Sequence, residues 1–198
     1  MNKLNSKDTK LAGFLFHGQI AQSNIDDFFI ERTKSRELTF DSISSKVSIS
    51  LLNSKLVDSA RKMSAVYIAI ASFENSVRSL ISERMLEAIG ENWWEEASIS
   101  ADIKTRAKRK IEDESQNRWH GPRGISQIYF TELKDLIHII TNNWDKFEDL
   151  LGDSDWVRHS IKSLERSRNV IMHSGELSLE DIQRIGGIIR DWLRQVGE

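Results

Sequence analysis

The sequence predicts an all-α protein, an antiparallel helical bundle of four to five core helices with an N-terminal extension. Apolar residues recur at steps of three and four through most of the chain, which is the period of an amphipathic helix. The only proline is Pro122, so almost no position is barred from a helix interior. With 198 residues, of which 39% are apolar, we expect one helical domain at 58–198 behind an extension at 1–57.

The composition excludes several classes of protein. There is no cysteine, and therefore no disulfide framework, thiolate nucleophile or cysteine-ligated zinc site. No apolar run approaches the ~20 residues that a membrane helix requires, and the first residues lack the apolar core of a secretory signal. We expect a cytoplasmic protein that does not contact a membrane. The net charge of −2 says little about a polyanionic partner.

The extension at 1–57 is the least regular part of the sequence. Its residues 47–51 alternate between apolar and polar side chains, as in a half-buried strand, but a short helix that leads into the next one fits equally well. We favour the helix.

The first core helix is expected at 58–89 and ends at Gly90. Beside its apolar stripe, Glu74 and Arg78 form a favourable i, i+4 pair, with Asn75 next to them. We interpret the pair as a surface salt bridge. A supporting role in a functional site is the alternative for these three residues. The stripe itself consists of Val66, Ile70, Phe73, Val77, Leu80 and Ile81.

Three further helical segments follow. A highly charged helix at 97–118 has few apolar residues and should lie at an edge of the bundle. The loop at 120–124 separates it from a core helix at 125–142, and a short helical turn at 144–151 ends at Gly152. The core helix is predicted from the apolar residues Ile125, Ile128, Tyr129, Leu133, Leu136, Ile137 and Ile140.

Two capped helices complete the bundle. Asp153 or Ser154 can cap the first, which ends at 174–175. Its apolar stripe leads to Arg168, an arginine at a position where the period predicts an apolar side chain. Ser178 and Asp181 open the last helix as a capping box. The two stripes are Val157, Ile161 and Leu164, then Ile182, Ile185, Ile189, Trp192 and Val196.

The candidate catalytic residues are Arg168, Asn169 and His173. An arginine on a buried stripe requires a partner or an anionic ligand such as a phosphate. Asn169 and His173 lie four residues apart on one face of the helix, and the helix dipole favours a protonated histidine in the last turn. A guanidinium, an imidazole and an amide are suited to cleavage of a phosphodiester without a metal ion. In RNA the nucleophile would be the substrate's own 2′-hydroxyl.

This pattern leaves two interpretations open. Arg and His five residues apart are a weak signal, which the intervening Asn169 makes more specific. Equally, Arg168 would be a structural residue if it were paired with an acid such as Glu74. Residues five apart lie about 140° apart around a helix, so Arg168 and His173 of one chain point in different directions. A second copy would complete the site, with two His173 side chains across a two-fold axis.

Motifs along two thirds of the chain resemble a known family. They are 67–69, 73–78, Gly90 with 92–94, 128–130, 143–144 with Phe147, and Arg168-Asn169-Val170-Ile171-Met172-His173. In these motifs, residues from about 58 to 194 resemble the HEPN superfamily (higher eukaryotes and prokaryotes nucleotide-binding). Within it, they are most similar to the subgroup named for a eukaryotic nuclear RNA quality-control endonuclease.

The resemblance implies a helical bundle, a homodimer with a composite active site, and metal-independent endoribonuclease activity carried by Arg168, Asn169 and His173. It also implies a supporting role for Glu74. Many members are toxins or effectors of phage defence, which suggests an antitoxin or defence-system partner. Others are non-catalytic binders of RNA, nucleotide or a partner protein, which is the alternative function. Members controlled by a nucleotidyltransferase continue the motif as His-x-Tyr, whereas Ser174 and Gly175 follow here.

Five basic residues are further candidates for contacts with RNA. Lys104, Lys108 and Arg109 lie on the charged helix, while His120 and Arg123 lie in the following loop. A solvated helix face is the favoured interpretation of the basic run, because the acids at 112–114 would oppose a polyanion. The other histidines lack metal-ligand spacing, and no glycine-rich phosphate loop is present, so no metal or cofactor is expected.

Overall fold

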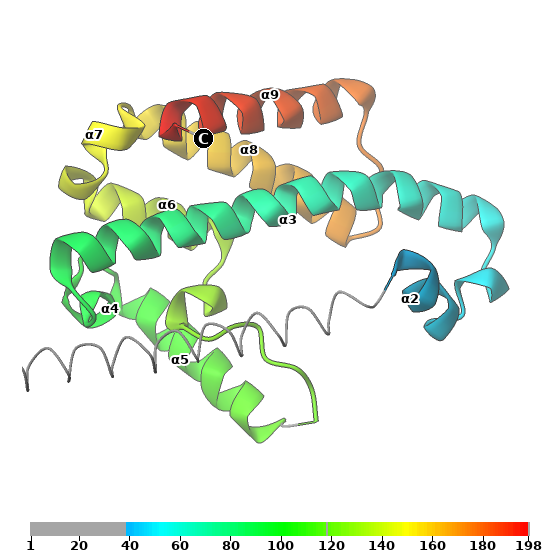
Figure 1. The fold of residues 1–198 in the computed structure, drawn as a ribbon, viewed down its shortest axis with the longest axis horizontal. Coiled ribbons are helices and arrows are strands. Elements are labelled where there is room, and N and C mark those ends of the chain that lie inside the picture. Colours follow the sequence, from blue (N-terminus) through cyan, green and yellow to red (C-terminus); the bar gives the residue numbers. More distant parts are fainter. Residues whose placement is uncertain (1–38, 118, 198) are drawn as a thin grey trace, which may run out of the picture. The chain divides into compact units, whose positions relative to one another are not determined.

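The computed structural model describes residues 39–117 and 119–197 (Figure 1). Every regular element in these two ranges is a helix, which confirms the all-α prediction. None of these helices has both the length and the apolarity needed to cross a membrane. The chain divides into two units between Val57 and Asp58.

The described part of the first unit contains the helix α2 (Phe40–Lys46) and the 3-10 turn η1 (Ile49–Leu51). The side chain of Thr39 caps α2 by accepting a hydrogen bond of 3.2 Å from the amide of Ser42. At 47–51, where we favour a short helix over a strand, a 3-10 turn forms at residues 49–51 and no strand is present. Residues 1–38, which make up most of the predicted extension, lie outside the described residues.

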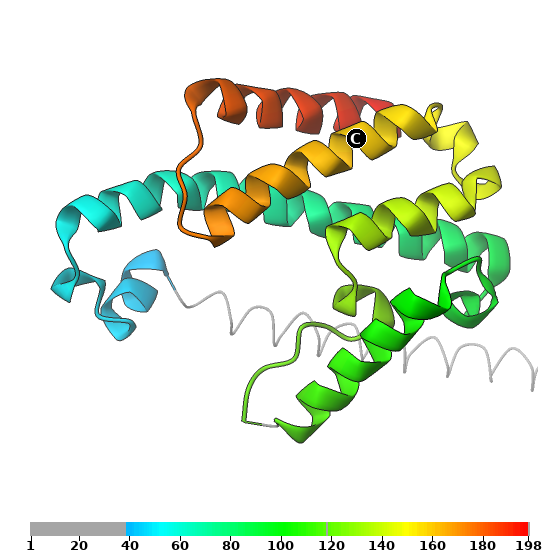
Figure 2. The ribbon, with the colours of Figure 1, turned by 180° about the vertical axis from the view of Figure 1, so that it is seen from behind.

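The second unit contains the predicted bundle. Its long first helix, α3, begins at Ser54, just before the unit boundary, and ends at Ile89. Figure 1 shows α8 running in the direction opposite to α3, α6 and α9, and Figure 2 shows the same arrangement from behind. The elements that follow α3 are α4 (Trp93–Glu96), α5 (Ala101–Gln116), η2 (Gln127–Phe130), α6 (Leu133–Asn142), η3 (Trp144–Lys146), α7 (Glu148–Leu151), α8 (Ser154–Met172) and α9 (Leu179–Val196).

One predicted helix is shorter than expected. The helix predicted at 125–142 begins only at Leu133, and the 3-10 turn η2 precedes it. Between them, Glu132 has an extended backbone and forms a capping box with Asp135. The Asp135 carboxylate accepts a hydrogen bond of 2.9 Å from the backbone amide of Glu132. This cap starts a new helix at a point where the apolar period continues unbroken. The prediction of Ile125 as a core residue was wrong, because its side chain is 90% exposed.

Aromatic packing joins three helices of the bundle. Trp192 of α9 is fully buried and makes an edge-to-face contact with Phe73 of α3 at 5.2 Å between ring centroids. Trp192 also stacks on the ring of Trp156 of α8, with 5.5 Å between the ring centroids. These rings pack the first turn of α8 against α9, and α9 against α3.

Candidate active site

The candidate residues lie at the C-terminal end of α8, and a Schellman motif ends that helix. His173 is the C-cap, and Ser174 after it adopts a left-handed conformation with φ of 60°. The amide of Ser174 donates to the carbonyl of Ile171 at 2.9 Å, and that of Gly175 donates to the carbonyl of Val170 at 2.8 Å. Ser174 and Gly175, which follow His173 directly, therefore fix the backbone that carries it.

The three candidate residues differ in exposure. Asn169 and His173 are exposed, whereas the side chain of Arg168 is 36% exposed. Within the described residues, no hydrogen bond or ion pair engages the side chain of Asn169 or His173. Both are therefore accessible to a ligand, and the position of Arg168 on the apolar stripe leaves its side chain half-buried.

Arg168 is held by a buried acid. Its Nε atom lies 3.4 Å from Oε2 of Glu74 on α3. Nε and Oε2 are the two atoms through which this ion pair is formed, and no hydrogen bond joins the Arg168 guanidinium to a described residue. A guanidinium has five N–H donors, and those of Arg168 are not hydrogen-bonded to any described residue. The ion pair proposed as the structural interpretation of Arg168 exists, and it leaves most of the group's donors available.

The Glu74–Arg78 pair lies in the interior of the bundle. The prediction of a surface salt bridge was wrong, because each side chain is only 9% exposed, and Nη2 of Arg78 lies 2.5 Å from Oε1 of Glu74. Arg78 also donates to the carbonyl oxygens of Ile128 at 3.3 Å and Thr131 at 3.1 Å. These bonds anchor η2 on α3 and satisfy the buried guanidinium.

Asn75 contributes to the same cluster. Its Oδ1 accepts a hydrogen bond of 3.3 Å from Nη1 of Arg78. The guanidinium of Arg78 also lies 5.9 Å from the centroid of the Tyr129 ring. The three predicted supporting residues thus form one network on α3, and of these three only Glu74 pairs with a candidate catalytic residue.

The other predicted RNA contacts lie on α5 and the loop after it. On α5, Lys104 contacts Glu95 at 3.4 Å and Lys108 contacts Glu112 at 3.9 Å, while Arg109 is exposed. In the loop, Arg123 pairs with Glu114 at 2.7 Å and the ring of His120 packs edge-on against that of Trp119. None of these five basic residues forms a hydrogen bond or ion pair with Arg168, Asn169 or His173. Their role in RNA binding stays a prediction.

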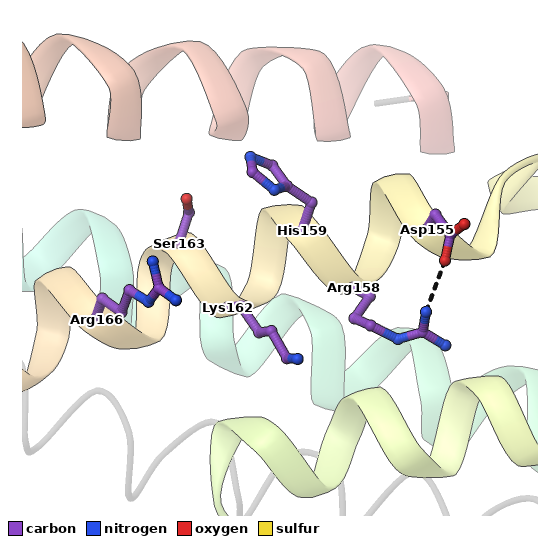
Figure 3. A pocket seen from close by; sticks show the side chains of 6 residues that line it. All are labelled: Asp155, Arg158, His159, Lys162, Ser163 and Arg166. Atoms are coloured by element: carbon purple, nitrogen blue, oxygen red, sulfur yellow. Dashed lines mark hydrogen bonds and ion pairs between the residues drawn. The ribbon is translucent and has the colours of Figure 1, made fainter.

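A basic surface on α8 was not singled out in the sequence. It forms a hollow of about 240 Å³ lined by Asp155, Arg158, His159, Lys162, Ser163 and Arg166 (Figure 3). The sequence did carry a signal for it, because three of the cations recur at intervals of four residues.

Among the described residues, no group of three or more histidine, cysteine, aspartate or glutamate side chains is placed to hold a metal ion.

Comparison with known proteins places the chain in a family. The model of the Swt1-like HEPN family matches residues 69–197, which include the whole of α5, α6, α8 and α9 and most of α3. No curated protein and no solved structure matches the chain significantly. The match covers more than half of the sequence and contains all three candidate catalytic residues, and the chain therefore belongs to the Swt1-like HEPN family.

Proposed function

We propose that this protein is an endoribonuclease that cleaves RNA through its own 2′-hydroxyl. The observation that supports this most is the arrangement at the end of α8. There, Asn169 and His173 are exposed, and Arg168 is paired with Glu74 while its guanidinium donates no hydrogen bond to a described residue. A guanidinium beside an accessible imidazole provides charge neutralisation and proton transfer at one phosphate.

In the proposed reaction, the substrate's O2′ attacks the adjacent phosphorus, and the bond from phosphorus to the leaving O5′ breaks. The proton of the 2′-hydroxyl passes to a general base, and a general acid protonates O5′. His173 acts in proton transfer, Arg168 neutralises the non-bridging oxygens, and Asn169 positions the phosphate. The products carry a 2′,3′-cyclic phosphate and a 5′-hydroxyl. All of these steps use side chains and the substrate alone.

The reaction needs two proton-transfer groups, and we propose that a second copy of the chain supplies the second His173. Apolar side chains are exposed beside the candidate site, with Val170 39% and Met172 54% exposed. Such residues at the end of α8 are suited to an isologous contact between two copies. In this homodimer, the two His173 side chains would together form one composite site at the two-fold axis.

The biological role proposed is that of a cytoplasmic toxin or phage-defence effector, restrained by an antitoxin or another defence-system protein. This follows from the family rather than from any contact in the fold. An enzyme that cuts cellular RNA has to be restrained until it is needed. Expression of the wild-type chain should therefore slow growth, and His173→Ala should relieve the effect.

A second candidate function has one observation in its favour. The ion pair between Arg168 and Glu74 is what a structural arginine would form. In that case the chain would be a non-catalytic HEPN module that binds RNA, nucleotide or a partner protein. Binding of RNA without cleavage would favour this function.

The test uses end-labelled single-stranded RNA with purified protein in excess chelator. We expect cleavage products that end in a 2′,3′-cyclic phosphate, and a loss of about 10²-fold or more in His173→Ala. His138→Ala is the matched control, because His138 is an exposed histidine on α6. Replacing the 2′-hydroxyl at the cleaved position by hydrogen should abolish the cut. Equal cleavage by wild type and His173→Ala would refute the assignment.

A further inference from the structure

Three cations follow one another along one face of α8. They are Arg158, Lys162 and Arg166, here called the α8 basic stripe; Lys162 and Arg166 are exposed, and Arg158 is partly exposed. Neighbours in the stripe are four residues apart, which places them about 6 Å apart along the helix axis and within one narrow sector of its surface. Continuing from Arg166 by three and then four residues reaches Asn169 and His173. The stripe therefore leads along the helix to the proposed catalytic end.

The charges of the stripe are largely unneutralised. Arg158 pairs with Asp155 at 2.6 Å, but both side chains are exposed, at 44% and 83%. Lys162 and Arg166 form no ion pair with any described residue. Besides Asp155, the acid on this side of α8 is Glu165, which is half-buried. On α5, Lys104 has an acid partner, Glu95, at 3.4 Å, and Lys108 has only a solvent-exposed contact with Glu112 at 3.9 Å.

The stripe also forms part of a concave surface. Its three cations line the hollow of about 240 Å³ together with Asp155, His159 and Ser163. In Figure 3 all six side chains come from α8, with Arg158 and Lys162 extending to one side of the helix and His159 and Ser163 to the other. A concave surface lined by cations and a hydroxyl fits an anion better than it fits an apolar ligand.

We propose that the α8 basic stripe binds successive phosphates of the RNA strand whose scissile phosphate lies at His173. The interval of about 6 Å between its cations is similar to the distance between neighbouring phosphates of an extended strand. The whole run from Arg158 to His173 spans about 22 Å, enough for several nucleotides on one side of the cut. The substrate is then single-stranded RNA that extends beyond the cleaved bond.

The course of the strand toward His173 rests on the proposed function, whereas binding of a strand by the α8 basic stripe can be tested independently of it. Arg166 lies about 10 Å along the helix from His173, and Arg158 lies farther still. A dinucleotide held at His173 cannot reach these cations, whereas a long RNA can. The stripe should therefore contribute to cleavage of long RNA and contribute nothing to cleavage of a dinucleotide.

Binding is measured with a single-stranded 2′-deoxy oligonucleotide, which keeps the phosphates but lacks the nucleophile. The stripe variant combines Arg158→Gln, Lys162→Gln and Arg166→Gln. We expect its affinity to fall about tenfold or more, and the slope of log affinity against log salt to become shallower by about 2. The matched control combines Arg184→Gln, Arg190→Gln and Arg194→Gln on α9, which removes the same number of cations.

The possible results distinguish failure of the α8 basic stripe to bind a strand from failure of the proposed nuclease activity. An unchanged salt dependence in the stripe variant, or an equal loss in the α9 control, overturns the proposal. Slower cleavage of long RNA at an unchanged rate on a dinucleotide supports it, whereas an equal slowing of both substrates overturns it by showing a disturbed His173. If wild type cuts no RNA at all, the proposed function fails, and the oligonucleotide measurement still decides whether the stripe binds a strand.

Discussion

The Nε atom of Arg168 lies 3.4 Å from Oε2 of Glu74 and connects a half-exposed guanidinium on α8 to a buried carboxylate on α3. The other carboxylate oxygen of Glu74 contacts Arg78, which is as buried as Glu74 itself. The Glu74 carboxylate thus pairs with two arginines, one buried and one partly exposed. Arg78 depends on it for charge compensation in the interior, whereas Arg168 remains accessible to solvent. Replacing Glu74 and replacing Arg168 should therefore have different consequences.

Glu74→Gln should destabilise the protein by about 3 kcal/mol, because it leaves Arg78 as a buried charge without its counter-ion. Arg168→Gln should cost no more than about 1 kcal/mol, because that pair is partly solvated. The free energies of unfolding are obtained from urea titrations. Cleavage should follow the opposite order, with a larger loss in Arg168→Gln than in Glu74→Gln, measured under conditions in which both variants are folded.

The control for this pair of variants is Arg190→Gln, which replaces an exposed arginine on α9. It should change neither stability nor cleavage. If Glu74→Gln were as stable as wild type, the carbonyl oxygens of Ile128 and Thr131 would be sufficient to compensate Arg78. If Arg168→Gln retained full activity, the role of Arg168 would be structural.

The sequence predicted most of the helices because their apolar period is a local property. The buried state of Arg78 could not be predicted in this way, since its acceptors Ile128 and Thr131 lie 50 and 53 residues away in the chain. A favourable i, i+4 pair has the same sequence pattern at the surface and in the interior. Only the packing of η2 on α3 decides between the two.

The break before α6 shows another limit of periodicity. Apolar spacing continues from Ile128 to Leu136, but the cap at Glu132 starts a new helix between them. Glutamate is not among the preferred N-cap residues, so this cap gave no clear signal in the sequence. At the candidate site, the sequence placed Arg168, Asn169 and His173 on one helix end. Their catalytic roles stay a prediction.

The turn after His173 offers a second prediction. Ser174 has a φ of 60°, which costs a non-glycine residue roughly 1 kcal/mol, so Ser174→Gly should raise stability by up to that amount. Gly175→Ala should lower it, because the new Cβ would lie 2.7 Å from Cγ1 and 2.9 Å from the carbonyl oxygen of Val170. The shifted backbone would also displace His173. Thermal unfolding and RNA cleavage measure the two effects.

Gly187→Ala is the control for these glycine substitutions. It lies within α9, and a Cβ built there meets no atom within 4 Å. Alanine should therefore stabilise α9 by up to about 1 kcal/mol and leave cleavage unchanged. Loss of activity in Gly187→Ala, or a Gly175→Ala protein with full stability, would contradict the assignment of the Schellman motif as the support of His173.

The composite site makes a quantitative prediction about mixed dimers. When wild type is mixed in equal amount with His173→Ala and the subunits are allowed to exchange, a random distribution leaves about a quarter of the dimers with two imidazoles. If cleavage needs both, about a quarter of the activity of an all-wild-type sample at the same total concentration remains, whereas independent protomers would retain about half. Mixing with His138→Ala should cause no loss, since each dimer then keeps both His173 side chains. A linear fall of activity with the fraction of His173→Ala would show that one chain contains a complete site, and the second proton-transfer group would have to come from that chain.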